Sequence, residues 1–529
     1  AQITLAYDHR VIDGADGATG DKGDKGDKGD TGDTGATGAS GVAGSITQLT
    51  DALIEDNSMY IGNDPSATTD SAEYNIAIGT TALDSVTTGH DNVAIGFNAL
   101  TANTTGYSNI AIGSESLNFS TTGYENIAIG LQALYSNTTG RGNVASGMGA
   151  LGSNTTGQDN IASGTNALGL NTTGIDNIAV GRAALLNNTI GQNNVAIGMK
   201  SMRMNTEGAN SIAIGRYSLH ENTQGSSNIA LGEYSLFSNT TANNNVAIGS
   251  SALKLNTTGY SNIAIGSESL NFSTTGYENI AIGLQALYSN TTGRGNVASG
   301  MGALGSNTTG QDNIASGTNA LGLNTTGIDN IAVGRAALLN NTIGQNNVAI
   351  GMKSMRMNTE GANSIAIGRY SLHENTQGSS NIALGEYSLF SNTTGSSNIA
   401  YGLGSLYSNT TGSYNIAIGH EANVGSGTLN NATAIGYAAV VSASNTIQLG
   451  NSSVTSINSS GTFTTASDRR LKKDIVDTRY GLNTILKLRP VDYQMKSNNL
   501  EQIGFIAQEL RPIVPEAVSG IEGDLEKGE

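Results

Sequence analysis

Ser467 and Lys472, near the C-terminal end of the sequence, are two side chains that could act together as a nucleophile and a base. A serine hydroxyl is a poor nucleophile unless a neighbouring group accepts its proton. Lys472 follows Ser467 by five residues, and a lysine can accept a proton where burial lowers its pKa. From spacing alone the alternative is a solvated charged turn, because the run 467–475 reads SDRRLKKDI.

A second candidate lies in the first residues, where His9 and Asp13 belong to the run DHRVIDG. This run resembles the C-terminal motif of dihydrolipoamide acyltransferases, and the resemblance implies that His9 matches the base that acts on a thiol. The likeness is confined to residues 3–14, and no counterpart of that family's catalytic core precedes them. We therefore expect residues 1–13 to be a leader without acyltransferase activity.

The remaining candidates are isolated, and none predicts a cofactor or a metal. The sequence has no P-loop, dinucleotide fingerprint or calcium-type repeat. Four histidines stand without metal-ligand spacing around them: His90, His220, His373 and His420. Three of the recurring N-x-[ST] sequons are at Asn103, Asn137 and Asn154. Such sequons accept glycans in secreted eukaryotic proteins, but here turn chemistry explains them.

The composition disfavours a globular metabolic enzyme. Among 529 residues only 13% are charged and 37% are hydrophobic, whereas ordinary domains are about a quarter charged. The formal net charge of −17 argues against nucleic-acid and anionic membrane partners. No apolar run is long enough for a membrane span, and the absence of cysteine excludes disulfides and thiolate metal sites. Because the chain begins at Ala1 without an initiator methionine, we expect a processed or truncated product.

Two repeats organise most of the chain. Glycine occupies every third position from Gly14 to Gly44, which predicts a collagen triple helix over 14–44, because only glycine fits at its crowded axis. Residues 45–57 carry apolar residues at helical spacing and are expected to form a short neck. From 58 to 448 the motif NIAIGxxALxxNTTGxx recurs every 17 residues without insertion, giving 23 copies. An uninterrupted register of this kind predicts a β-solenoid with one repeat per coil.

The residue types suggest how a coil is built. Ile76 and Ile78 share one face of a short strand and Ala77 faces the other way, so we expect each coil to bury about three large aliphatic side chains. We expect left-handed geometry in the NTTG turn and ladders of stacked asparagines. Residues 103–241 are identical to residues 256–394. We call these blocks the first and second copies, and expect the region to supply length rather than a unique pocket.

The repeats NIAIG, NVAIG and NATAIG resemble the left-handed β-rolls in the heads of trimeric autotransporter adhesins, and the NTTG turns resemble phage-type tail-fibre repeats. After a linker, 449–466, the runs SDRRLKKDI, LRPVDYQMK and IGFIAQELRPIVPEAV resemble the chaperone of endosialidase tailspikes. That resemblance implies a small α/β chaperone domain over 467–529, with Ser467 as nucleophile, Lys472 as base and Asp468 flanking the cut. In that family a long helical stretch normally follows, so the domain ending at Glu529 is expected to be incomplete.

The sequence thus predicts a mainly β homotrimeric fibre with a leader, a collagen rod, a β-solenoid shaft and a chaperone that removes itself. Its expected role is structural: attachment, on a virion or outside a cell, to a host-surface glycan or protein. The alternative is a bacterial cell-surface adhesin or extracellular filament. Any enzymatic activity would be self-cleavage.

Overall fold

The computed structural model describes residues 52–55, 58–62, 72–457, 479–494 and 501–518. The chain divides into two compact units, Ala1–Val454 and Thr455–Glu529, and each is described by itself. The leader with His9 and Asp13, the collagen-like tract and residues 467–478 lie outside the described residues.

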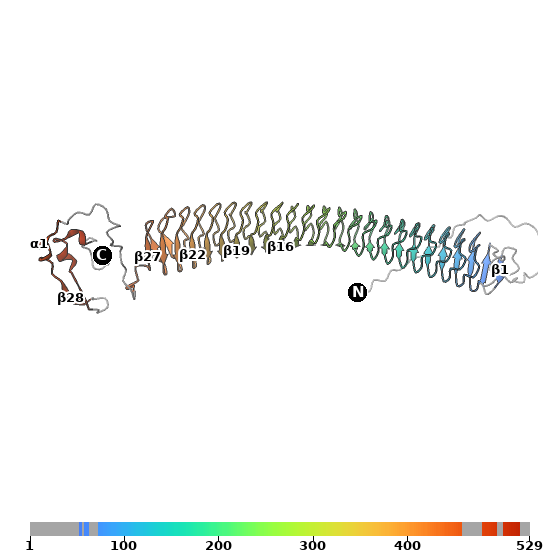
Figure 1. Ribbon diagram of the computed structural model, residues 1–529, viewed down its shortest axis with the longest axis horizontal. Helices are drawn as coiled ribbons and strands as arrows, with labels where there is room; N and C mark the ends of the chain where they lie inside the picture. The colour runs from blue at the N-terminus through green and yellow to red at the C-terminus, as the bar shows by residue number, and fades with distance from the viewer. Residues whose placement is uncertain (1–51, 56–57, 63–71, 458–478, 495–500, 519–529) are drawn as a thin grey trace, which may run out of the picture. The chain divides into compact units, whose positions relative to one another are not determined.

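A single long sheet of short strands runs through the first unit as a gently curved rod (Figure 1). Its strands are β1 (Ala52–Glu55), β2 (Ser58–Ile61), β3 (Ile76–Ile78), β4 (Val93–Ile95), β5 (Ile110–Ile112), β6 (Ile127–Ile129), β7 (Val144–Ser146), β8 (Ile161–Ser163), β9 (Ile178–Val180), β10 (Val195–Ile197), β11 (Ile212–Ile214), β12 (Ile229–Leu231), β13 (Val246–Ile248), β14 (Ile263–Ile265), β15 (Ile280–Ile282), β16 (Val297–Ser299), β17 (Ile314–Ser316), β18 (Ile331–Val333), β19 (Val348–Ile350), β20 (Ile365–Ile367), β21 (Ile382–Leu384), β22 (Ile399–Tyr401), β23 (Ile416–Ile418), β25 (Thr433–Ile435) and β27 (Ile447–Leu449).

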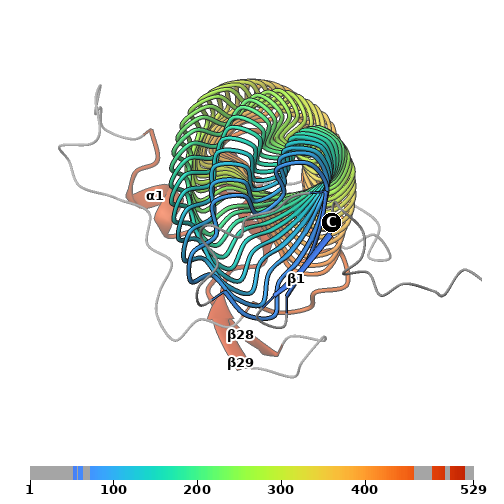
Figure 2. The same cartoon turned by 90° about the vertical axis from the view of Figure 1, so that its right-hand side faces the viewer.

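The strands stack in parallel at the period of the sequence repeat. Each strand from β2 to β22 pairs with the next strand, and the paired residues are 17 positions apart. The strand β23 pairs with β25 at the same spacing, and β25 pairs with β27 after a shorter coil. A second, two-stranded parallel sheet is formed by β24 (Asn423–Val424) and β26 (Val440–Val441). Viewed from the end, successive coils superimpose with a gradual twist (Figure 2). The predicted β-solenoid of 17-residue repeats is therefore confirmed.

The neck ends in a strand. Residues 52–55 form β1, which pairs antiparallel with β2. The helical spacing noted in the sequence therefore does not produce a helix over Ala52–Glu55, where the exposed edge of the first coil offers a strand partner.

The solenoid buries the central alanine of each strand from β3 to β23 and not the larger residues on either side of it, contrary to the expected packing. Ala77 is fully buried, whereas Ile76 is 38% exposed and Ile78 is 37% exposed. Among the aliphatic side chains of this coil that are larger than alanine, Leu83 and Val86 are buried, and in the next coil Leu100 is. The expectation of three buried large aliphatics per coil is wrong, because the narrow interior takes the alanines with one or two larger side chains and leaves the β-branched side chains of the strand outside.

Left-handed backbone also lies elsewhere than expected. Gly79 has a φ of 134° and Leu83 has a φ of 55°, and equivalent residues repeat this geometry along the rod. Gly106, in the NTTG turn, does not have a positive φ. Its backbone instead lies so close to the next coil that an added Cβ would be 2.3 Å from the carbonyl oxygen of Gly123. Glycine in this turn therefore serves close stacking of coils, while the left-handed residues lie after the strand and also two residues before it, as at Asp91 and Ser108.

Asparagine ladders run through the interior as the sequence predicted. Asn154 Nδ2 donates to Asn137 Oδ1 over 2.9 Å, and also to the carbonyl of Gly157 over 3.0 Å. Asn103 is cut off from this ladder by Ser120, and neither Asn103 Oδ1 nor Ser120 Oγ has a hydrogen-bond partner. A second ladder begins at Asn75, one residue before each strand.

The second unit is a small α/β arrangement, in agreement with the sequence. Its elements are α1 (Leu482–Ile485), β28 (Val491–Gln494), β29 (Glu501–Gly504), α2 (Ala507–Leu510) and the 3-10 helix η3 (Pro515–Ala517). The strands β28 and β29 pair as an antiparallel hairpin.

Candidate functional site

The predicted nucleophile and base, Ser467 and Lys472, and the flanking Asp468 lie outside the described residues. Their roles therefore remain predictions. What the structure describes is the part of the second unit that follows them, from 479 to 518, with a gap at 495–500.

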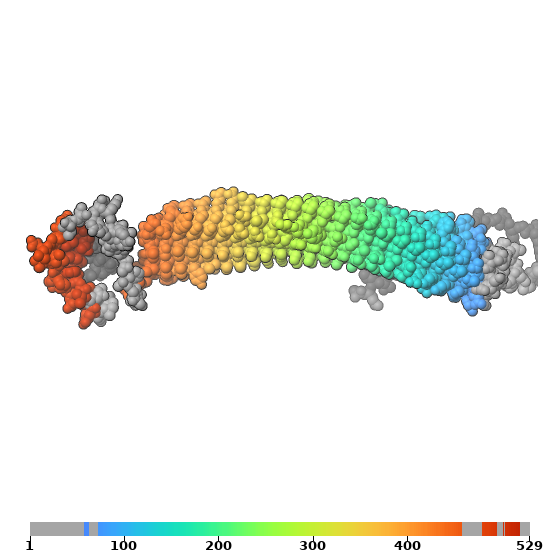
Figure 3. All heavy atoms as spheres, in the orientation of Figure 1, coloured from blue at the N-terminus to red at the C-terminus, as the bar shows by residue number. Residues whose placement is uncertain are grey.

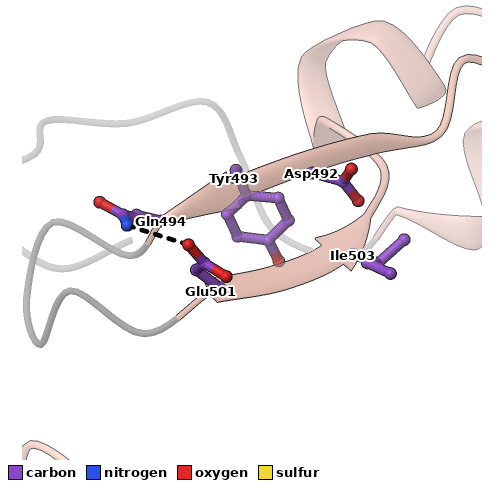
Figure 4. Close-up of a pocket in the computed structure, with 5 residues that line it drawn as sticks. All are labelled: Asp492, Tyr493, Gln494, Glu501 and Ile503. Carbon is purple, nitrogen blue, oxygen red and sulfur yellow. Dashed lines mark hydrogen bonds between the residues drawn. The ribbon is translucent and has the colours of Figure 1, made fainter.

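The hairpin of this unit carries a hollow of about 750 Å³, lined by residues of both strands (Figure 4). Tyr493 lies against Gly504, where an added Cβ would meet the ring at 3.5 Å. Gln494 Nε2 donates to Glu501 Oε1 over 3.4 Å. The hollow is lined by acids, an amide, a phenol and an aliphatic side chain, so it contains no nucleophile paired with a base.

Two ion pairs tie the helices of the second unit to its other segments. Arg489 Nε donates to Glu509 Oε2 over 2.9 Å, and this contact holds the pKa of the Glu509 carboxyl below its usual value. Glu516 accepts hydrogen bonds from Tyr480 and Arg479, and the bond from Tyr480 is the main cause of its lowered pKa. These pairs are exposed, so their role is to orient segments rather than to do chemistry.

The second unit has no buried core among its described residues. No residue of α1, α2 or η3 is buried. Ile503 is 81% exposed and Leu486 is 73% exposed, and other aliphatic residues share this exposure. A folded domain that leaves such side chains in water lacks its main source of stability.

The solenoid has an uncovered apolar surface of its own. The first and third residues of the strands from β3 to β23, mostly isoleucine and valine, point outward and form what we call the outer apolar stripe. Ile129 and Ile282 are each 43% exposed. The coils stack without a break along the rod (Figure 3), so the stripe residues recur at each coil. Serine takes the third position in β7, β8, β16 and β17, so there the first residue of the strand carries the apolar stripe.

Among the described residues, no group of three or more His, Cys, Asp or Glu side chains is placed to hold a metal ion. The histidines predicted to be isolated belong instead to aromatic stacks. The His90 ring lies 5.2 Å from that of Tyr107 and nearly parallel to it. His373 stacks on Phe390 at 5.2 Å, and Phe390 stacks on Tyr407 at 5.3 Å. The sequence analysis missed these stacks, although aromatic residues 17 positions apart were a visible signal.

The sequons at Asn103, Asn137 and Asn154 are turn residues. All three side chains are fully buried, and Asn137 Nδ2 donates to the carbonyl of Gly140 over 3.1 Å. An amide in this position is inaccessible in the folded coil, in agreement with the interpretation as turn chemistry.

Comparison with known proteins identifies the C-terminal region. Residues 467–519 match the family described as chaperone of endosialidase, so the long β-solenoid is followed in the sequence by a domain of this chaperone type. No curated protein matches the chain. No helix among the described residues has the length and hydropathy that a membrane span requires.

Proposed function

We propose that the chain forms a homotrimeric, tail-fibre-like shaft for surface attachment, assembled by a C-terminal chaperone that cleaves itself off. The observation that carries the proposal is the chaperone match at 467–519, which follows the long solenoid in the sequence. A chaperone encoded after a series of similar coils meets a folding need, because coils of such similar sequence can pair in the wrong register.

Two uncovered surfaces support association with identical chains. The outer apolar stripe runs in register along the solenoid, so a second copy presents the same spacing of side chains to the first. The second unit leaves Leu486 and Ile503 in water, and packing against sister chains would bury them. Closed cyclic symmetry covers such surfaces without leaving an open end for further addition.

For the self-cleavage we place the nucleophile at Ser467, the base at Lys472 and the broken peptide bond between Ser467 and Asp468. The resemblance to the chaperone family supports these roles, and the segment's own chemistry is compatible with them, since a lysine base needs only a lowered pKa. The product would be a shaft without the second unit.

The test compares Ser467→Ala and Lys472→Ala with the control Lys473→Ala in the full chain, with intact mass as the readout. We expect the control to be cut after Ser467 and both test variants to stay whole. A Ser467→Ala variant that still yields the shorter product would exclude this serine as the nucleophile, and an uncut parent chain would exclude self-cleavage under the conditions used.

A further inference from the structure

The two copies of the duplicated segment end in different surroundings, and the difference creates a groove. At the C-terminal end of the second copy and in the coils that follow it, a cavity of about 660 Å³ is lined by Tyr387, Leu403, Tyr407, Glu421, Ala438 and Val440, among others. Tyr387 is the counterpart of Tyr234 in the first copy, at an offset of 153 residues. Coils beyond residue 394 are no longer identical to those beyond 241, so Lys254 corresponds to Tyr407 and Gln285 to Ala438.

In the first copy a cation of the protein itself covers the tyrosine. Lys254 Nζ lies 5.4 Å from the centre of the Tyr234 ring, and Arg216 lies at 5.5 Å from the same ring. In the second copy Arg369 lies 5.6 Å from the Tyr387 ring, but the lysine is replaced by Tyr407. The first copy thus shows that this ring accommodates an ammonium group.

The replacement adds a second aromatic wall to the groove. The Tyr407 ring is nearly parallel to Phe390, with 5° between their planes, whereas Tyr387 is inclined to Phe390 by 59°. Tyr387 and Tyr407 therefore flank the groove at a wide angle to each other. Tyr407 is 44% exposed, so its ring is accessible from the groove.

The same sequence differences remove the hydrogen-bond partner of a carboxylate at the groove. In the first copy Gln285 Nε2 donates to Glu268 Oε2 over 2.7 Å. In the coils after the second copy Ala438 cannot donate, and the exposed side chain of Glu421 makes no hydrogen bond or ion pair within the described part of the chain. The groove therefore combines two tyrosine rings, a carboxylate without a counter-ion and the apolar side chains of Leu403 and Val440.

We propose that this groove binds a quaternary ammonium group of the choline type. Tyrosine faces and a carboxylate attract a cation, and aromatic walls are the usual recognition device for quaternary ammonium ligands. A primary ammonium has three N–H donors to satisfy, whereas the methyl groups of a quaternary ammonium suit the walls formed by Leu403 and Val440. The inference deepens the attachment role proposed above and rests on it.

The test uses the full chain and ligand-observed NMR, with tetramethylammonium as the probe and phosphocholine and free lysine as further arms. We expect tetramethylammonium and phosphocholine to bind with similar, millimolar-range affinity, and lysine to bind at least about tenfold more weakly. Tyr407→Lys introduces the residue that the first copy carries, so the coil tolerates it, and we expect loss of binding because the protein's own ammonium fills the groove.

Two further variants test whether binding depends on the carboxylate of the groove or on acidic residues elsewhere on the surface. Glu421→Gln is expected to weaken tetramethylammonium binding about threefold, as for an exposed charge pair, whereas the matched control Glu268→Gln leaves it unchanged. Absence of binding in the parent chain, unchanged binding in Tyr407→Lys, or lysine binding as tightly as tetramethylammonium would overturn the proposal. A native mass of the same sample reports the oligomeric state separately, so failure of the groove and failure of the trimer are distinguishable.

Discussion

Completing the interrupted asparagine ladder should stabilise the solenoid locally. Ser120 stands where most coils have asparagine, and it leaves Asn103 Oδ1 without a partner. In an intact stretch the amide of Asn154 donates to Asn137 over 2.9 Å. The variant Ser120→Asn would supply the missing donor to Asn103 and a new acceptor for Asn137.

The magnitude follows from the two hydrogen bonds that the variant adds. A typical intramolecular hydrogen bond contributes about 1 kcal/mol, and an unsatisfied buried acceptor carries a penalty of similar size. We expect about 1–2 kcal/mol of added local stability, which corresponds to roughly 5- to 30-fold slower opening of the affected coils. Neighbouring coils already hold asparagine at this place, so the larger side chain fits the backbone geometry.

Hydrogen exchange by peptide is the suitable assay, because a long repeat array does not unfold in one step and a single melting temperature would hide a local gain. Peptides that carry the Ser120→Asn substitution differ in mass from the otherwise identical peptides around Ser273, and they should exchange more slowly than those second-copy peptides, whereas peptides around Asn324 should not change. Ser120→Ala is the control, since it removes the orphaned hydroxyl without adding a ladder. Equal protection in the asparagine variant and the parent would refute the reasoning, as would an equal gain in the alanine control.

Three other predictions test different parts of the structure. Leu168→Ala should destabilise its coil by about 2–5 kcal/mol, because the side chain is fully buried; unchanged exchange in peptides around it would contradict the packing described here. Ile265→Glu with Ile282→Glu, on the outer apolar stripe, should separate the associated chains while exchange protection inside each coil is kept; an unchanged native mass would show that the stripe is not an interface. Burial lowers the pKa of His220 and His373 from the usual 6.5, so these histidines become protonated at a higher pH in the unfolded chain than in the folded chain. The stability that the neutral rings provide should be complete above about pH 6.5 and fall as the pH drops below it, which peptide exchange at pH 7 and pH 5 can measure against His→Gln variants.

The solenoid could be predicted because its constraints are local and periodic. Gly79 and its equivalents mark every coil, and the stacked asparagines follow from residues such as Asn137 and Asn154 recurring at one position. Periodicity alone did not show which face of the strand is buried. The alternation of Ala77 and Ile78 is compatible with burial of either residue. Which one is buried depends on the width of the interior of the closed coil.

Other features depend on contacts that a single repeat does not contain. Leu83 adopts a left-handed conformation that leucine disfavours on its own. This conformation could therefore be recognised from the structure of the closed coil but not from the sequence. The groove beside Tyr407 arises where two nearly identical stretches diverge, and its counterpart at Lys254 has to be compared in space to be recognised. The proposed pair of Ser467 and Lys472 rests on resemblance.

Native mass spectrometry of the full chain after expression, with dissociation to measure the mass of its subunits, tests the central claim most directly. The account predicts a trimer whose subunits end at Ser467. A trimer of uncut chains would contradict self-removal of the chaperone, and a monomer would contradict the fibre itself.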